Sequence, residues 1–138
     1  MKQNLDRLVI FFCLIMCVRG DLCTCASYVI EEGGFSEDNL VYIITYDQPF
    51  VKCAHDGLES CKNFCFESWY SATDGGDLNV IPPGGDETVG QLSCRYLGRD
   101  VAGFKIGVFS QACGSDMYDT KLRTKQSLCC LDGSHIQC

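Results

Sequence analysis

The stretch CKNFC, residues 61–65, carries two cysteines four positions apart, and the fold is expected to form around it. In a helix, residues four apart lie on one face, so the sulfurs of Cys61 and Cys65 point the same way. Near the start of the chain, Cys23 and Cys25 share one face if their segment is extended. We therefore expect Cys61 and Cys65 to form disulfides with Cys23 and Cys25, in an order that the spacing leaves open.

The helix around this stretch is predicted over residues 56–71. Asp56 and Glu59 have the spacing of a capping box, which satisfies free backbone amides at a helix start. Residues spaced three and four apart then share the face that carries the two sulfurs. They are Leu58, Cys61, Cys65, Ser68 and Trp69. We expect Trp69 to be a core anchor rather than a platform on which a ligand stacks, because aromatic side chains dominate small cores.

Residues 1–20 predict a secretory signal peptide. Lys2 and Arg7 flank an unbroken apolar run of eleven residues at 8–18, and small residues, Val18 and Gly20, occupy the −3 and −1 positions of a cleavage site. The run is shorter than the roughly 20 residues that span a membrane. We expect the mature protein to be one secreted, extracellular domain over residues 21–138, without membrane insertion.

Cysteine is the most unusual feature of the composition. Two of the 12 cysteines lie in residues 1–20, and the remaining ten are Cys23, Cys25, Cys53, Cys61, Cys65, Cys94, Cys113, Cys129, Cys130 and Cys138. In a small secreted domain an even number of cysteines indicates a disulfide framework, here of five bridges. Zinc binding is the alternative to disulfide formation for these cysteines, but the sequence contains no Cys-x-x-Cys knuckle. We expect no metal site among them.

The remaining chain predicts a small disulfide-rich α+β fold with two short helices packed on a small antiparallel sheet. The apolar run at 40–46 indicates a strand buried on both faces, and 50–53 and 104–108 indicate two more. The second helix is expected at 88–97, with Asp86 as its N-cap and Gly98 as its C-cap.

The C-terminus predicts a hairpin. Asp132-Gly133 forms a two-residue turn between Cys130-Leu131 and residues 134–136, because Gly readily adopts positive φ. Adjacent strand residues face opposite sides, so Cys129 and Cys130 require different partners.

The charge excludes two classes of partner. The net charge of −7 becomes −9 without residues 1–20, which hold three basic side chains and one acidic. Binding of nucleic acid and of anionic membranes depends on Lys and Arg neutralising phosphate. We expect neither, and predict a monomer that meets an extracellular protein target.

The sequence offers few residues for catalysis. His55 and His135 are the only histidines, and both are expected at the surface; no nucleophile elbow or zinc-protease helix occurs. We therefore expect no catalytic residue and no cofactor. Two groups of charged residues are expected to be simply solvated, but each leaves a weaker alternative open. The loop 74–87 could bind calcium through Asp74, Asp77, Asp86 and Glu87. A basic face could form from Lys121, Arg123 and Lys125.

Short motifs spread along the mature chain resemble those of the insect follicle cell protein 3C-like secreted proteins. They are Cys23-Thr24-Cys25-Ala26, Cys61-x-x-x-Cys65, Gly75-Gly76-Asp77-Leu78, Val89-Gly90-Gln91-x-x-Cys94, Leu128-Cys129-Cys130-x-x-Gly133 and Cys138. The resemblance implies a small arthropod secreted protein, associated in that family with the follicle cells that build the eggshell. It implies no catalytic residues.

Two classes of function follow. The first is a secreted non-enzymatic effector or binding protein of arthropod type, such as a venom or salivary toxin acting on an extracellular receptor or channel. The alternative is a structural component of an extracellular coat such as eggshell or cuticle matrix. The chain lacks the low-complexity repeats that help coat proteins assemble, which favours the effector or binding protein. A net charge of −9 disfavours a pore blocker, since channel mouths attract cations.

Overall fold

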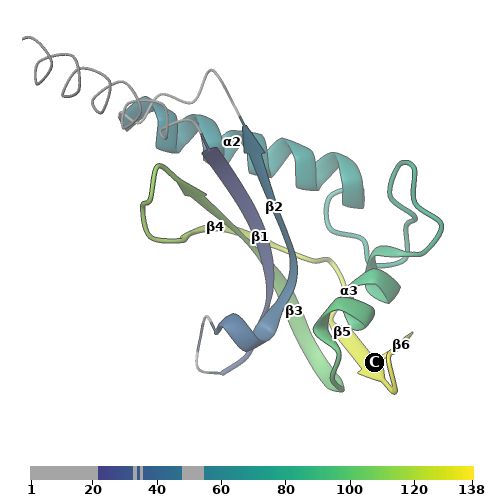
Figure 1. Ribbon diagram of the computed structural model, residues 1–138. Helices are drawn as coiled ribbons and strands as arrows, with labels where there is room; N and C mark the ends of the chain where they lie inside the picture. The colour runs from purple at the N-terminus through teal and green to yellow at the C-terminus, as the bar shows by residue number, and fades with distance from the viewer. Residues whose placement is uncertain (1–21, 33, 35, 48–54) are drawn as a thin grey trace, which may run out of the picture.

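The computed structural model describes residues 22–32, 34, 36–47 and 55–138. Within these residues the chain forms two α-helices and a six-stranded antiparallel sheet (Figure 1). The elements are β1 (Leu22–Ile30), the 3-10 helix η1 (Glu37–Asn39), β2 (Leu40–Asp47), α2 (His55–Thr73), α3 (Val89–Leu97), β3 (Val101–Ala112), β4 (Tyr118–Arg123), β5 (Leu128–Leu131) and β6 (Ser134–Ile136). The predicted combination of two helices with an antiparallel sheet is confirmed. The predicted signal peptide, the strand at 50–53 and Cys53 lie outside the described residues.

The sheet is built around β1 and β3. Its strand order is β2-β1-β3-β5-β6, and β4 pairs with β3 beside this path. The strand expected at 104–108 is the middle of the longer β3, which pairs first with β5 and then with β1. Gly103 lies at an irregularity within the β5 pairing, between Ala102 and Phe104, and has a φ of 86°, which favours glycine. One long bent strand therefore joins the two halves of the sheet.

Alternation along β1 assigns its side chains to two faces. Cys23, Cys25, Ser27 and Val29 lie on the face toward the helices, since the two cysteines bond to α2 and Val29 packs in the core cluster with Leu78 and Cys94. Tyr28 lies on the other face and meets Phe109 edge to face, with ring centroids 5.3 Å apart. Both helices therefore cover the same side of β1.

Strand β2 corrects the expectation of burial on both faces. It is the edge strand of the sheet and pairs only with β1 in the described sheet, and Tyr42 and Ile43 are 46% and 49% exposed. An unbroken apolar run is typical of a central strand, but here the strand lies at the edge. Tyr42 toward the helices and Ile43 on the opposite face both stay about half-exposed. Hydrophobicity alone did not distinguish the edge of the sheet from its centre.

Helix α2 begins earlier and ends later than predicted. It runs from His55 to Thr73, which places Asp56 in the first turn instead of at the N-cap, so the predicted capping box is wrong. Leu58 is 44% exposed, whereas Cys61 and Cys65 are fully buried. The buried stripe of α2 therefore starts at the first disulfide.

Helix α3 has one of its two predicted caps. Gly98 ends it in the left-handed conformation, with a φ of 66°. At the other end Thr88, not Asp86, is the N-cap: its backbone is extended and its hydroxyl accepts a hydrogen bond from Gln91 N at 3.2 Å.

Four disulfides link described residues. They are Cys23–Cys61, Cys25–Cys65, Cys94–Cys130 and Cys129–Cys138. The expected clamp between β1 and α2 is present, with Cα atoms 5.4 Å apart in both of its bonds. Cys129 and Cys130 have different partners, as expected. Cys113 is also disulfide-bonded, while the fifth bridge of the prediction requires Cys53, which is not described.

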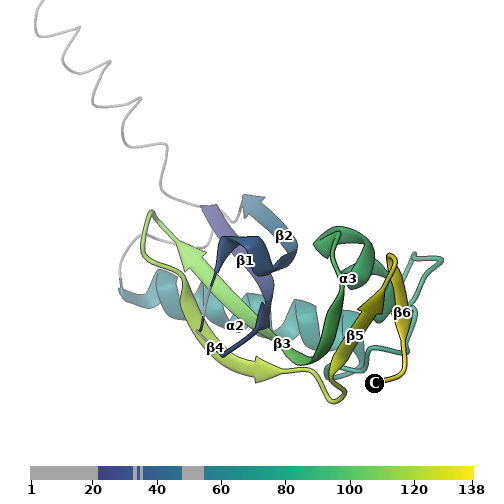
Figure 2. The same cartoon turned by 90° about the horizontal axis from the view of Figure 1, so that it is seen from below.

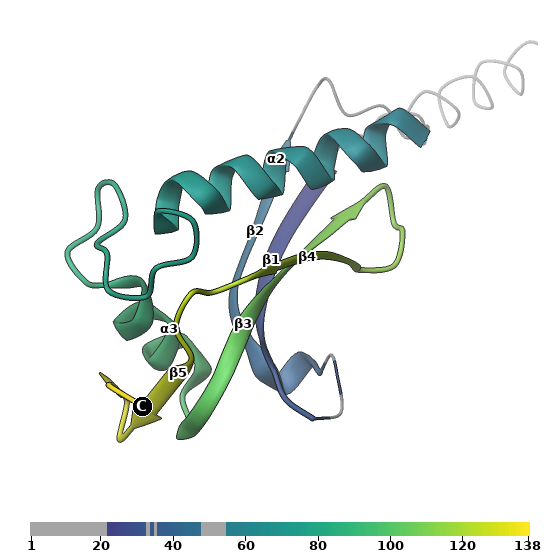
Figure 3. The same ribbon diagram turned by 180° about the vertical axis from the view of Figure 1, so that it is seen from behind.

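The helices lie at opposite ends of the strands. Figure 1 shows α2 crossing one end of β1 and β2, while α3 lies beside β5 and β6 at the other end. The view from behind shows the same separation (Figure 3), and the view from below shows α3 beside β5 and β6 (Figure 2). The hairpin of β5 and β6 turns at Asp132 and Gly133, both at positive φ, as predicted. Within the described residues, no helix is long and apolar enough to cross a membrane.

Candidate functional site

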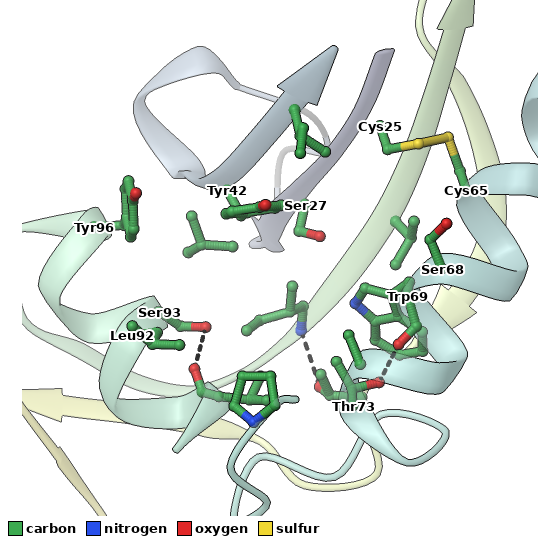
Figure 4. A pocket seen from close by; sticks show the side chains of 18 of the residues that line it. Cys25, Ser27, Tyr42, Cys65, Ser68, Trp69, Thr73, Leu92, Ser93 and Tyr96 are labelled. Atoms are coloured by element: carbon green, nitrogen blue, oxygen red, sulfur yellow. Dashed lines mark hydrogen bonds between the residues drawn. A yellow bond between two sulfur atoms is a disulfide. The ribbon is translucent and has the colours of Figure 1, made fainter. Parts of the chain in front are cut away.

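A cavity of about 350 Å³ lies between the sheet and the two helices (Figure 4). At one end α2 is bonded to β1 through Cys23 and Cys25. At the other end Val29 of β1 packs with Cys94 of α3. Because each helix is anchored to a different end of the strands, the surface between the two anchors is left partly uncovered, and this surface is the floor of the cavity.

The sheet register decides which side chains form the floor. Ser27 of β1 pairs with Tyr42 of β2 on one side and with Val108 of β3 on the other. Directly paired residues point to the same face of a sheet, so all three face the helices. The neighbouring pairs add Ile44 and Ile106. The floor is therefore a row of apolar and aromatic side chains with the Ser27 hydroxyl at its centre.

The two helices supply the walls. Trp69 and Ala72 face the cavity from α2, and Val89, Leu92 and Tyr96 face it from α3. Trp69 corrects the expectation of a core anchor, because it is only half-buried and belongs to none of the buried clusters of the described residues. Its ring packs over Gly76, where a β-carbon would approach the indole to 2.7 Å.

Three of the hydroxyls around the cavity are held by the backbone. Thr73 Oγ1 donates to Trp69 O at 2.7 Å and accepts from Gly76 N at 2.8 Å. Ser93 Oγ donates to Val89 O at 2.8 Å. Thr124 Oγ1 donates to Gln126 O at 2.8 Å and accepts from Ile106 N at 3.1 Å. These groups hold the walls in place, and their hydroxyl donors are already used.

Two aromatic side chains and one ion pair lie at the rim. Tyr42 and Tyr96 meet edge to face, with ring centroids 6.2 Å apart, and connect β2 with α3. Burial raises the pKa of Tyr42, with smaller contributions from Tyr46 and Tyr96, so Tyr42 is a neutral phenol at physiological pH. Arg95 pairs with Glu87 at 2.9 Å and is mostly exposed.

The chemistry of this lining suits binding. Among the described residues, the cavity wall contains no His, Asp or Glu, and its two cysteines, Cys25 and Cys65, are bonded to each other. Its volume falls within the range of small-molecule pockets, which are mainly apolar with a few placed polar groups.

The acidic loop does not bring its carboxylates together. Asp77 Oδ1 accepts from Asn79 N and from Gln126 Nε2, both at 2.9 Å, and the Asn79 hydrogen bond chiefly lowers the pKa of Asp77. Glu87 pairs with Arg95. The described residues contain one cluster with metal-ligand spacing, Cys23, Cys25 and Cys65, all of which are in disulfides. Asp74, Asp77, Asp86 and Glu87 thus form no common site there.

The basic strip is broken up as well. Lys121 has a φ of 66°, which interrupts the alternation needed to align it with Arg123 and Lys125. Both terminal nitrogens of Arg123 donate to the carboxylate of Asp119, at 2.9 and 2.8 Å, and this hydrogen bonding holds the pKa of Asp119 well below its usual range. Lys125 Nζ donates to Asp74 O at 2.6 Å. Lys121 Nζ also pairs with Asp119, at 3.2 Å. Lys121 and Arg123 therefore share one carboxylate, and Lys125 is held separately at the acidic loop.

The expectation that His135 lies at the surface is wrong. Its ring is half-buried against Gly90 of α3, where any β-carbon would come within 2.4 Å of the imidazole. Burial lowers the pKa of His135 and favours the neutral ring. This contact closes the hairpin onto α3 and lies away from the cavity. The side chain of His55 is not among those described.

The sequence reasoning missed Ser27 as a residue of the site. The signal was present, because Ser27 continues the alternation of Cys23 and Cys25 and therefore shares the face that meets the helices. What the sequence did not show was that α2 and α3 separate at this point and leave Ser27 under a cavity.

Comparison with known proteins adds no relative: no protein-family model, curated protein or solved structure matches this chain. The resemblance to the follicle cell protein 3C-like proteins stays a prediction from the motifs.

Proposed function

We propose that this is a secreted, non-enzymatic binding protein that holds a small apolar molecule in the cavity between α2, α3 and the sheet. The observation that carries the proposal is a mainly apolar, partly open pocket inside a covalently fixed frame. A folded domain of this size normally closes its interior to close-packed density. Here disulfides hold the helices and strands in position, so the fold can stay stable although side chains do not fill the space between them.

Two features support the absence of catalysis and the extracellular location. Among the described residues, the cavity wall holds no His, Asp, Glu or Lys for acid–base work, and its ionisable side chains are tyrosines and Arg95. Disulfides persist in oxidising compartments, in agreement with the predicted signal peptide. We further propose that Cys53 and Cys113 form a fifth disulfide, since the other eight cysteines beyond residue 20 are paired with one another.

The sequence predicts a secreted effector or binding protein, and of these two roles we propose the binding protein. A ligand carrier or scavenger needs a monomeric frame and no protein target. Action on a receptor or channel, and a place in an extracellular coat, stay predictions from the sequence.

The test is titration of the folded, oxidised protein over residues 21–138 with N-phenyl-1-naphthylamine, an uncharged probe that fluoresces in apolar surroundings. We expect a saturable rise in fluorescence at one probe per chain. Ala72→Phe, which fills the cavity from α2, is expected to weaken binding about tenfold or more. Ala72→Leu fills less of the cavity and is expected to weaken binding by less.

The matched control is Ser71→Phe. Ser71 is the neighbouring residue of α2 and is exposed, so the same ring is added outside the cavity. This variant should bind the probe as the unsubstituted protein does, and circular dichroism should show all variants folded. The proposal fails if the probe does not bind saturably, or if Ala72→Phe and Ser71→Phe behave alike.

A further inference from the structure

Ser27 is a polar residue of the sheet whose side chain has no partner among the described residues. The residue is 6% exposed and lies at the centre of the cavity floor. Among the described residues, nothing forms a hydrogen bond with its hydroxyl, which faces the cavity in Figure 4. The oxygen itself keeps accessible surface toward the cavity, so water or a ligand can satisfy it, as is usual for polar groups that no protein atom pairs.

The contrast with the other buried hydroxyls of the cavity indicates that Ser27 has a different role. Thr73, Ser93 and Thr124 are equally buried, and each of them donates to a backbone carbonyl. A serine on a helix can satisfy its hydroxyl in this way through the carbonyl of the preceding turn, as Ser93 does. Ser27, in the middle of β1, donates to no carbonyl of the described chain. The Ser27 hydroxyl is therefore available to a molecule in the cavity.

The electrostatics of the wall restrict the charge of that molecule. The one charged side chain among the described lining residues is Arg95, which lies at the rim and is already paired with Glu87. No carboxylate in the described part of the chain faces the cavity to hold an ammonium group, and a desolvated ion without a partner is strongly disfavoured. The interior therefore favours an uncharged molecule.

We infer that the cavity selects uncharged apolar molecules that carry a hydroxyl or carbonyl oxygen, and that Ser27 is the residue that binds this oxygen. The inference rests on the proposed binding function and adds the ligand class and the residue that recognises it. Trp69, Val108 and Leu92 contact the apolar body of the ligand, while Ser27 forms its hydrogen bond from the floor.

Isothermal titration of the oxidised protein with three naphthalene probes tests this selection. Naphthalene has no polar group, 2-naphthol adds one neutral oxygen, and 2-naphthoate adds a charge. A net neutral hydrogen bond is worth about 1 kcal/mol, so we expect 2-naphthol to bind about fivefold more tightly than naphthalene. We expect 2-naphthoate to bind more weakly than either.

Ser27→Ala is expected to remove the preference for 2-naphthol while leaving naphthalene affinity within about twofold. Ser110→Ala is the matched control. Ser110 is 4% exposed, lies on the same face of the sheet and pairs with Cys25, but it lines a different surface hollow. This variant should keep the fivefold preference.

The outcomes separate the two proposals. Equal binding of naphthalene and 2-naphthol to the unsubstituted protein would overturn the selection and leave the apolar binding site intact. A preference that survives Ser27→Ala would overturn the role of Ser27. Absence of binding by all three probes, together with no binding of N-phenyl-1-naphthylamine, would overturn the proposed function itself.

Discussion

The two ends of the helix-covered face are held together by different means. Where α2 meets β1, two disulfides form a buried cluster with Ala112, and the sulfurs fill the space that apolar side chains would occupy. Where α3 meets the sheet, Val29, Leu78, Ile106 and Leu128 form an ordinary apolar core with a single disulfide, Cys94–Cys130. The cavity lies between these two regions.

The difference indicates how a small domain can tolerate a hollow interior. The close packing that normally fixes helices on a sheet is concentrated at the α3 end, whereas covalent bonds replace it at the α2 end. Residues of the clamp should therefore control stability, and residues of the cavity floor should control binding. Substitutions in each region can separate these two effects, and the largest is expected at the clamp.

Removal of the Cys23–Cys61 disulfide should destabilise the protein most. We expect the double variant Cys23→Ala with Cys61→Ala to lose about 2–5 kcal/mol of unfolding free energy, measured by urea titration. The same treatment of Cys129–Cys138, whose cysteines are only nine positions apart and whose Cys138 is exposed, should cost less. Equal losses from the two pairs would contradict the special role of the clamp.

Two hydroxyls of the cavity should differ in their effect on stability. Thr124→Val leaves Ile106 N–H without its side-chain acceptor and Gln126 C=O without its donor, and should cost about 1–3 kcal/mol. Ser27→Ala removes a hydroxyl that has no partner in the described chain, so the unliganded protein should be unchanged or slightly more stable. Thermal unfolding measures both. A loss for Ser27→Ala as large as that for Thr124→Val would show that Ser27 is structural.

The smallest expected effect is a pH dependence of the unfolding free energy, which arises from His135 at the α3 end. Burial lowers the pKa of His135 below its usual 6.5, so between the two values the unfolded chain holds more protons than the folded one. The contribution of His135 to the unfolding free energy is therefore fully present above about pH 6.5. It is lost as the pH falls through the lower pKa of the folded state.

The measurement is the urea midpoint at several pH values between 7.5 and 5, above the range in which Asp119 titrates. His135→Gln should flatten this profile, because the side chain no longer binds a proton. An unchanged slope in His135→Gln would assign the pH dependence to other groups.

Local patterns in the sequence were good guides to local structure. The spacing of Cys61 and Cys65, the Asp132-Gly133 turn and the Gly98 cap each depend on neighbouring residues, and each is confirmed. The predicted burial of β2 is wrong because strand order is a property of the whole sheet, which local hydrophobicity does not encode.

The site was missed for a related reason. Trp69 was correctly placed on the sulfur-bearing face of its helix, but whether that face meets packed side chains or a cavity depends on where α3 docks. Ser27 is a single serine in an apolar strand, and only the register of β1 with β2 and β3 shows it at the centre of the floor.

The most direct test of the cavity uses Trp69 itself, since it is the only tryptophan of the chain and lies in the cavity wall. Titration with menthol, an uncharged and non-fluorescent cyclic alcohol, should change the Trp69 emission saturably at one molecule per chain. In Ala72→Phe the change should disappear. A response that never saturates, or one that is the same in Ala72→Phe, would contradict a ligand site between the helices and the sheet.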